Sequence, residues 1–402
     1  MPPIQELPPA TPAFVYDESR ILETARLLHR AGTASGCRIL YSIKSFPFES
    51  VLGLLEPWVD GFSVSSLFEA RLAATIGDGG RSLHISTPGL RREEMSEIGS
   101  LCGFIGFNSL GQFRRFLPFL RNGSSAGLRI NPKLSFLDDR RYDPCREFSK
   151  LGVPLEELER VLAKGDFPGN RLRGLHFHNV FSSRSFDPLQ KTVARIEESL
   201  ADWLPELEWL NLGGGYLFET EADLQGLCEV AGGLRRRWDL DVYFEPGKAL
   251  VGQAGYLVAS VIDLFENDGK LVAILDTTVN HHPETFEYQI RPEPAWDEPG
   301  EGQVAILAGC TCLAGDVFGE YRFERPLVLG DRVAFQNVGA YSLIKANRFN
   351  GYNLPAIYAW DGRDGLRLMK SYDYEGYASQ WTADAEAPLD YHSRNVRDYP
   401  KP

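Results

Sequence analysis

The sequence of 402 residues has no long apolar run and begins without a secretion signal. A helix that spans a membrane needs at least about 18 consecutive apolar residues, and no such stretch occurs. The first residues, MPPIQELPPATP, are rich in proline, carry Glu6 and lack the apolar core of a signal peptide. We therefore expect a protein that has no membrane partner and is located in the cytoplasm.

The sequence is also poor in cysteine motifs, because none of its six cysteines belongs to a CxxC pair. They are Cys37, Cys102, Cys145, Cys228, Cys310 and Cys312. Disulfide-stabilised domains and zinc modules need clustered cysteines, so this dispersed pattern argues against both and agrees with a reducing compartment. For Cys310 we prefer a buried, inert thiol over a reactive one.

Positive charge is scarce as well, since 42 Lys and Arg residues stand against 55 Asp and Glu residues, a formal net charge of −13. Nucleic-acid-binding proteins gather positive charge to meet phosphates, so this balance argues against a nucleic-acid partner. No GxGxxG motif follows an N-terminal strand, and dinucleotide binding is therefore not indicated. The composition is otherwise typical of a globular protein with a large core.

What the sequence does contain is a regular alternation of short apolar segments with amphipathic ones. The predicted strands are 37–43, 61–65, 83–87, 104–108, 127–131, 172–178, 207–212 and 242–245. The predicted helices between them include 67–76, 91–101, 110–120, 155–163 and 192–204. Eight such units over roughly 210 residues suit a (β/α)8 TIM barrel, whose usual length is about 250 residues.

After about residue 250 the pattern changes to strands separated by turns. The predicted strands there are 256–265, 271–276, 304–307, 332–338 and 365–372. The segment Phe14-Val15-Tyr16 is expected to join them as an N-terminal strand. We therefore predict an α/β protein with two domains, a barrel at 20–255 and a mainly β domain at 1–19 and 256–402.

Reactive groups of such barrels lie at the C-terminal ends of the strands, and Lys44 ends the first one. Burial disfavours a charged amine and lowers its pKa, which suits a Schiff base with a carbonyl such as that of pyridoxal phosphate. The alternative is a lysine at the barrel rim whose amine reaches the solvent.

The sixth strand ends in His176-Phe177-His178-Asn179, and the seventh runs into Gly213-Gly214-Gly215. An HxH pair suggests a metal, but the other strand ends lack further His and Asp ligands, so we expect none. A histidine stacked on a planar cofactor, or one in the core, is the preferred interpretation. The glycines predict an anion cradle where a helix begins, with a simple turn as the alternative.

The eighth strand ends in Glu245-Pro246-Gly247-Lys248. Glu245 has two interpretations, a partner for a nearby arginine or the counter-charge of a protonated pyridinium nitrogen. Lys248 would add positive charge near a phosphate.

Together these motifs resemble the fold type III pyridoxal-phosphate decarboxylases, a group with the alanine-racemase-like fold that includes ornithine, diaminopimelate and carboxynorspermidine decarboxylases. The resemblance implies pyridoxal 5'-phosphate as cofactor, with Lys44 bound to it covalently, His178 stacked on its ring and Glu245 paired with its nitrogen. The further cofactor contacts that it implies are Gly213, Gly214, Gly215, Gly247 and Tyr341.

The resemblance also implies a homodimer whose active sites are shared across the interface. Cys312 in CTCLAGD matches the catalytic cysteine, and Asp316 matches an acid that contacts the substrate, both from the other subunit. Phe349 and Asn350 in FNGY match a segment at the same interface.

Within the group, CLAGD, FNGYNLP and the stretch that begins at His281 are most similar to carboxynorspermidine decarboxylase. We therefore expect a decarboxylase of carboxynorspermidine or carboxyspermidine, with His281 among the substrate contacts. Lys248 stands where that pattern has an acidic residue, and the segment after Asn179 lacks an expected Cys-Glu pair. Because Arg184 could meet an acidic group, a smaller or acidic amino acid is the alternative substrate. An amino-acid racemase and a non-catalytic cofactor-binding homologue are the remaining alternatives.

Overall fold

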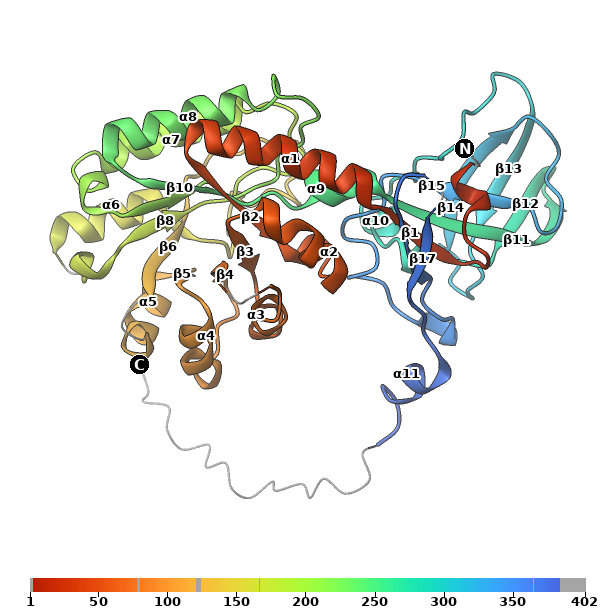
Figure 1. The fold of residues 1–402 in the computed structure, drawn as a ribbon, viewed down its shortest axis with the longest axis horizontal. Helices are drawn as coiled ribbons and strands as arrows, with labels where there is room; N and C mark the ends of the chain where they lie inside the picture. The colour runs from red at the N-terminus through yellow and green to blue at the C-terminus, as the bar shows by residue number, and fades with distance from the viewer. Residues whose placement is uncertain (1–2, 78–79, 121–123, 166, 364, 384–402) are drawn as a thin grey trace.

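The computed structural model describes residues 3–77, 80–120, 124–165, 167–363 and 365–383, and Figure 1 shows a helix-covered barrel beside a separate β-sheet. The predicted β domain at 1–19 and 256–402 includes residues 1–2, 364 and 384–402, which lie outside the described residues. None of the helices in the described part combines the length and the hydropathy that crossing a bilayer requires.

The barrel is a closed ring of eight parallel strands within the described residues, as the sequence predicts. They are β2 (Cys37–Ser42), β3 (Gly61–Val64), β4 (Ser82–Thr87), β5 (Phe104–Phe107), β6 (Ser125–Asn131), β8 (Gly174–His176), β9 (Trp209–Asn211) and β10 (Asp241–Phe244). The ring closes because β10 pairs with β2, and a short strand β7 (Val153–Pro154) is attached to β6. The sixth predicted strand, 172–178, is too long, since only β8 forms ladder hydrogen bonds there.

Amphipathic helices cover the outside of the ring. They are α1 (Glu18–Ser35), α2 (Glu49–Leu55), α3 (Leu67–Ala74), α4 (Met95–Leu101), α5 (Leu110–Phe116), α6 (Leu155–Lys164), α7 (Asp187–Leu200) and α8 (Gln225–Trp238). In α6, Leu155, Leu158 and Leu162 recur at helical spacing and are buried against the barrel. Helix α7 begins earlier than predicted because Pro188 suits the first turn of a helix.

The second part of the chain is a sheet in the order β14-β13-β12-β11-β1-β16-β17, with β15 paired to β11. Its strands are β1 (Ala13–Asp17), β11 (Gly255–Asn267), β12 (Lys270–Leu275), β13 (Gln303–Ala308), β14 (Val317–Phe323), β15 (Arg332–Phe335), β16 (Ala356–Trp360) and β17 (Leu366–Lys370). Phe14 pairs with Leu257 and Ile357, which confirms the N-terminal strand. Strand β14 was not predicted, because Gly319 interrupts its apolar pattern.

The described residues also form three short α-helices, namely α9 (Lys248–Val251), α10 (Glu284–Glu287) and α11 (Tyr374–Ala378). The chain passes from β1 directly into α1 and returns from the barrel through α9 into β11 (Figure 1). The barrel and the sheet are therefore joined by two connections, one at Asp17 and one at Gly252–Ala254.

One tryptophan packs at the end of the barrel where the strands begin. Trp209 is 2% exposed, and its indole Nε1 donates to Ser125 Oγ over 2.8 Å. The ring fits only because Gly127 and Gly174 have no side chain. A Cβ atom at Gly174 would lie 2.0 Å from Trp209 Cδ2, and one at Gly127 2.3 Å from Cη2.

We expect Gly174→Ala to lower the free energy of unfolding by about 1–3 kcal/mol, because overpacking forces the ring or the strand to shift. Gly106→Ala is the matched control, since its Cβ would have no neighbour closer than 3.4 Å. Urea denaturation of both variants checks this. Equal midpoints for the two variants would contradict the packing argument.

Candidate active site

The site is built around Lys44, which follows β2 in a tight turn. Ser45 holds this turn, since its hydroxyl donates to Ser42 O over 2.8 Å and lies 3.0 Å from Tyr41 Oη. Ser42 N–H in turn donates to Pro246 O, so the ends of β2 and β10 are tied together. The side chain of Lys44 is half-buried and lines a pocket at this end of the barrel.

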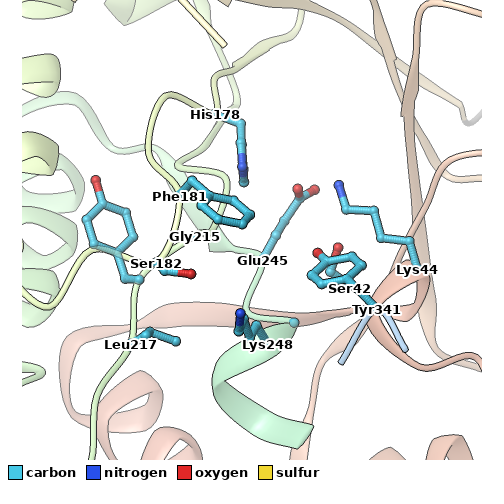
Figure 2. Close-up of a pocket in the computed structure, with 12 residues that line it drawn as sticks. Ser42, Lys44, His178, Phe181, Ser182, Gly215, Leu217, Glu245, Lys248 and Tyr341 are labelled. Atoms are coloured by element: carbon cyan, nitrogen blue, oxygen red, sulfur yellow. The ribbon is translucent and has the colours of Figure 1, made fainter. Parts of the chain in front are cut away.

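The pocket lies beside Lys44, at the end of the barrel where the strands end. It is lined by Ser42, Lys44, His178, Phe181, Ser182, Gly215, Tyr216, Leu217, Glu245, Gly247, Lys248 and Tyr341. Six of these residues were predicted as cofactor contacts, and they come from four strand ends and the second part of the chain. Figure 2 shows the Lys44 amine and the Glu245 carboxylate pointing toward one another.

The amine of Lys44 is held in a weakly hydrated environment. Burial lowers its pKa from the ordinary value of 10.5, and the guanidinium of Arg129 lowers it further, while Glu245 opposes both effects. A lysine with a lowered pKa is uncharged for a larger fraction of the time and is therefore a better nucleophile and base.

Glu245 is the carboxylate that faces this amine, and it is only 7% exposed. Asn211 Nδ2 donates to Oε1 over 2.8 Å, and His176 Nε2 lies 3.3 Å from Oε2. Burial by itself raises the pKa of Glu245, but His176, Lys44 and Asn211 outweigh it and hold the pKa well below its usual range. The carboxylate is therefore a permanent negative charge on the pocket floor.

The two histidines of the sixth strand have different positions. His176 is buried beside Glu245 and does not line the pocket. His178 lines the pocket (Figure 2). Burial lowers the pKa of both imidazoles, and for His178 the charge of Lys44 adds to the effect. Gly214 N–H donates to His178 Nδ1 over 3.1 Å, so the proton of the neutral ring is on Nε2.

The three glycines form a loop that only glycine permits. Gly213 and Gly215 have φ angles of +66° and +94°, and a Cβ at Gly214 would lie 2.0 Å from Glu245 O. Gly215 lines the pocket, and among the described residues no protein acceptor takes its N–H group. This loop can cradle an anion, although the next helix, α8, begins only at Gln225 and not directly after the glycines.

Tyr341 reaches the pocket from the second part of the chain. Its backbone N–H donates to Ser45 O over 2.9 Å, next to Lys44. Its φ angle of +59° is unusual for a residue with a side chain and costs free energy. The docking of this loop on the barrel therefore holds the ring at the pocket.

Other predicted site residues do not line this pocket. Cys312 and Phe349 are exposed, and Asn350 Oδ1 accepts from Cys312 N–H over 2.8 Å. These residues form a surface group of the single chain. Arg184 pairs with Glu219 over 3.0 Å and lines an adjoining cavity together with Lys248.

Two further predicted substrate contacts are buried in the second part of the chain. Asp316 is 3% exposed, and its carboxylate accepts from Val279 N, Thr311 N and Thr311 Oγ1. His281 is 1% exposed and bonds to Thr277 Oγ1 through Nδ1, while its Nε2 has no partner. Their roles as substrate contacts stay predictions. The described residues contain no group of three or more His, Cys, Asp or Glu side chains that could hold a metal ion.

This geometry can be compared with known proteins. A family model described as "Pyridoxal-dependent decarboxylase, C-terminal sheet domain" matches residues 13–339. The chain belongs to this family. It is therefore a pyridoxal-phosphate-dependent decarboxylase, as the motifs predict.

Two curated relatives of this decarboxylase cover nearly the whole chain. Carboxynorspermidine/carboxyspermidine decarboxylase of Campylobacter jejuni is 33% identical over 92% of this chain and 97% of the relative. Carboxyaminopropylagmatine decarboxylase of Synechocystis sp. is 34% identical over 94% and 97%. The solved structure of the Campylobacter jejuni carboxynorspermidine decarboxylase complexed with norspermidine has a TM-score of 0.83 and 31% identity, and the match covers 92% and 99% of the two chains.

The pocket of this decarboxylase fits its family cofactor. It offers an amine for the aldehyde, an ionised carboxylate for the ring nitrogen, a neutral imidazole and a free backbone N–H in a glycine loop. The sequence did not predict the lining residues Ser42, Phe181, Ser182, Tyr216 and Leu217. All of them lie within a few residues of a predicted motif, so their position next to a strand end was the available signal.

The lowered pKa of Lys44 predicts how the stability of the protein depends on pH. In the cofactor-free protein, the unfolded state binds a proton at Lys44 below the ordinary pKa of 10.5, whereas the folded state does so only at its lower pKa. Stability therefore falls as the pH drops through this window. We expect Lys44→Met to raise the melting temperature, and to raise it more at about pH 7 than at about pH 10. Thermal unfolding at both values checks this, and an equal gain at both would contradict it.

Proposed function

We propose that this enzyme decarboxylates carboxynorspermidine or carboxyspermidine to the corresponding polyamine. The observation that carries the proposal is the full-length similarity to a decarboxylase of these substrates, together with the fold similarity to an enzyme solved with norspermidine. Such a substrate has an amino-acid end that reacts and an arm that bears further ammonium groups.

We propose the cofactor contacts from the family resemblance and from the pocket, whose lining includes Gly215 but not Gly213 or Gly214. Lys44 would bind pyridoxal phosphate covalently, Glu245 would pair with its ring nitrogen, and His178 would lie against the ring. Gly213, Gly214, Gly215 and Gly247 would surround the phosphate together with Tyr341. The bound cofactor supplies the electron sink that accepts the electron pair of the breaking bond to the carboxylate.

The side chains of the protein have separate tasks in this proposal. The Lys44 amine is deprotonated readily because burial lowers its pKa, so it can exchange with the amino group of the substrate. Glu245 remains ionised, which keeps a proton on the group that it pairs with. The neutral His178 contributes a flat ring without adding a second positive charge beside Lys44.

We propose a homodimer in which Cys312 of one subunit completes the pocket of the other and donates a proton to the carbon that lost CO2. The support is that Cys312 is exposed on the single chain and does not line its own pocket. Asp316, Phe349 and Asn350 would belong to the same shared region. A cytoplasmic location is proposed because all six cysteines are free thiols.

A second candidate substrate is carboxyaminopropylagmatine, since a decarboxylase of that compound is equally similar to this chain. It shares the reacting end with carboxynorspermidine but ends in a guanidinium group. The reaction would be the same, and the two candidates differ only in how the far end of the arm is bound.

The substrate proposal is tested by CO2 release from a panel of carboxynorspermidine, carboxyspermidine, carboxyaminopropylagmatine, diaminopimelate, ornithine and glutamate. We expect the first two to have a kcat/KM at least about tenfold higher than the rest, a difference of about 1.4 kcal/mol. Lys44→Ala should abolish both turnover and the visible absorbance of the covalently bound cofactor. A preference for glutamate would instead favour the acidic-substrate alternative, and full activity of Lys44→Ala would exclude the assigned role.

Cys312 allows a separate test of the proton donor. We expect Cys312→Ala to lower kcat by about 10² or more while the cofactor still binds, because general acids contribute about 10²–10⁴ to such steps. Protonation at the wrong atom should also increase the fraction of carbonyl by-product. Product analysis by mass spectrometry measures this ratio, and Cys310→Ala is the matched control. Unchanged kcat and product ratio for Cys312→Ala would remove the assigned role.

A further inference from the structure

Two buried polar side chains next to Tyr341 are bonded to each other. His282 is 4% exposed and Ser342 is 2% exposed, and His282 Nδ1 lies 2.8 Å from Ser342 Oγ. The hydroxyl of Ser342 donates its one proton to Val338 O over 2.6 Å. The imidazole is therefore the donor in the other bond, from Nδ1–H to Ser342 Oγ. The two bonds form a chain that runs from His282 through Ser342 to Val338.

The imidazole of His282 is uncharged at neutral pH, and its backbone is fixed. Burial, together with the charges of Lys248 and Lys345, lowers the pKa of His282 to about 4. Its backbone N–H donates to Val279 O over 3.0 Å, and its carbonyl accepts from Thr285 N–H over 3.0 Å. His282 therefore presents a neutral ring from a backbone that is held on both sides.

The loop that receives this bond, residues 337–342, contains two strained backbone positions. Asn337 and Tyr341 have φ angles of +61° and +59°, which residues with side chains seldom adopt. Such a conformation costs free energy and persists only where its surroundings hold it. The loop therefore depends on its hydrogen bonds to the rest of the protein.

Tyr341 is held both at its own backbone and at the next residue. Its N–H donates to Ser45 O over 2.9 Å, in the turn that carries Lys44. Ser342 receives the bond from His282, which lies between β12 and α10. Because the ring of Tyr341 lines the pocket, both contacts determine where that ring lies (Figure 2).

We propose that His282 is a positioning residue for the cofactor, which acts through Ser342 to keep Tyr341 against the bound pyridoxal phosphate. This inference rests on the proposed contact between Tyr341 and that cofactor. His282 is buried and is not among the residues that line the pocket, so it acts only through the loop. A loop that is already ordered loses less freedom when the cofactor binds, and the bound cofactor is therefore released more slowly.

The donor is tested with His282→Leu and His282→Asn, through the rate at which the holoenzyme releases pyridoxal phosphate after transfer to cofactor-free buffer. We expect His282→Leu to raise this rate about tenfold, because a buried hydroxyl loses its donor. His282→Asn is the matched control, since its amide nitrogen is as many bonds from the backbone as Nδ1 and should keep the rate within about threefold of the wild type. The visible absorbance of the bound cofactor measures the rate. Equal rates for the two variants would overturn the inference.

Ser342→Ala removes the same link with a smaller change in volume, so it tests the inference even if His282→Leu does not fold. We expect this variant to raise the release rate about tenfold as well, because His282 then has no group through which it can act on the loop. A rate equal to that of the wild type would contradict the proposed chain from His282 to Tyr341.

Tyr341→Leu separates this inference from the proposed function. We expect Tyr341→Leu to release the cofactor faster than the wild type, and the double variant with Ser342→Ala to release it no faster than Tyr341→Leu alone, because both changes remove the same contact. A further increase in the double variant would mean that Ser342 and His282 support the fold in general, and only the inference would fail. Release from Tyr341→Leu at the rate of the wild type would refute the proposed cofactor contact, and the inference with it.

Discussion

The candidate active site depends on one constraint, a partly buried lysine amine held beside a carboxylate whose pKa is lowered. Burial favours the uncharged amine of Lys44, whereas Asn211 and His176 keep the charge on Glu245 despite burial. Only a closed ring of strands brings these groups together, because Lys44 follows β2 and Glu245 follows β10, which are distant in sequence and adjacent in the barrel. The hydrogen bond from Ser42 N–H to Pro246 O holds the two strand ends together next to Lys44 and Glu245.

The second part of the chain contributes Tyr341 to the pocket, and the backbone of this residue is strained. Tyr341 adopts a left-handed backbone conformation and donates its N–H to the turn that carries Lys44. The free energy that this conformation costs has to be offset by packing between the sheet and the barrel. A displacement of the sheet would therefore remove Tyr341 from the pocket and loosen the turn at Lys44 at the same time.

The sequence predicted the parts of the site that follow from local rules. Strand alternation located the barrel, and the rule that reactive groups follow strand ends located Lys44, His178, the glycine loop and Glu245. The sequence did not predict Phe181, Ser182 and Leu217, because their positions depend on backbone hydrogen bonds between two loops. Ser183 N–H donates to Gly215 O, and Ser183 O accepts from Leu217 N–H. No periodicity reveals such a contact. Strand β14 was missed for a related reason, since its partner β13 and not its own pattern stabilises it.

Substrate choice within this family depends on groups that sequence identity does not separate, because relatives at 33% and 34% identity act on different arms. An ammonium group is a compact donor that one carboxylate oxygen can bind, whereas a guanidinium is a planar fork that binds two oxygens at once. In this chain, Lys248 Nζ lies 3.4 Å from Oε2 of Glu284, so a buried carboxylate balances its ammonium group. The basic residue after Glu245-Pro246-Gly247, where the resemblance leads us to expect an acidic one, therefore adds no unpaired charge to the pocket lining.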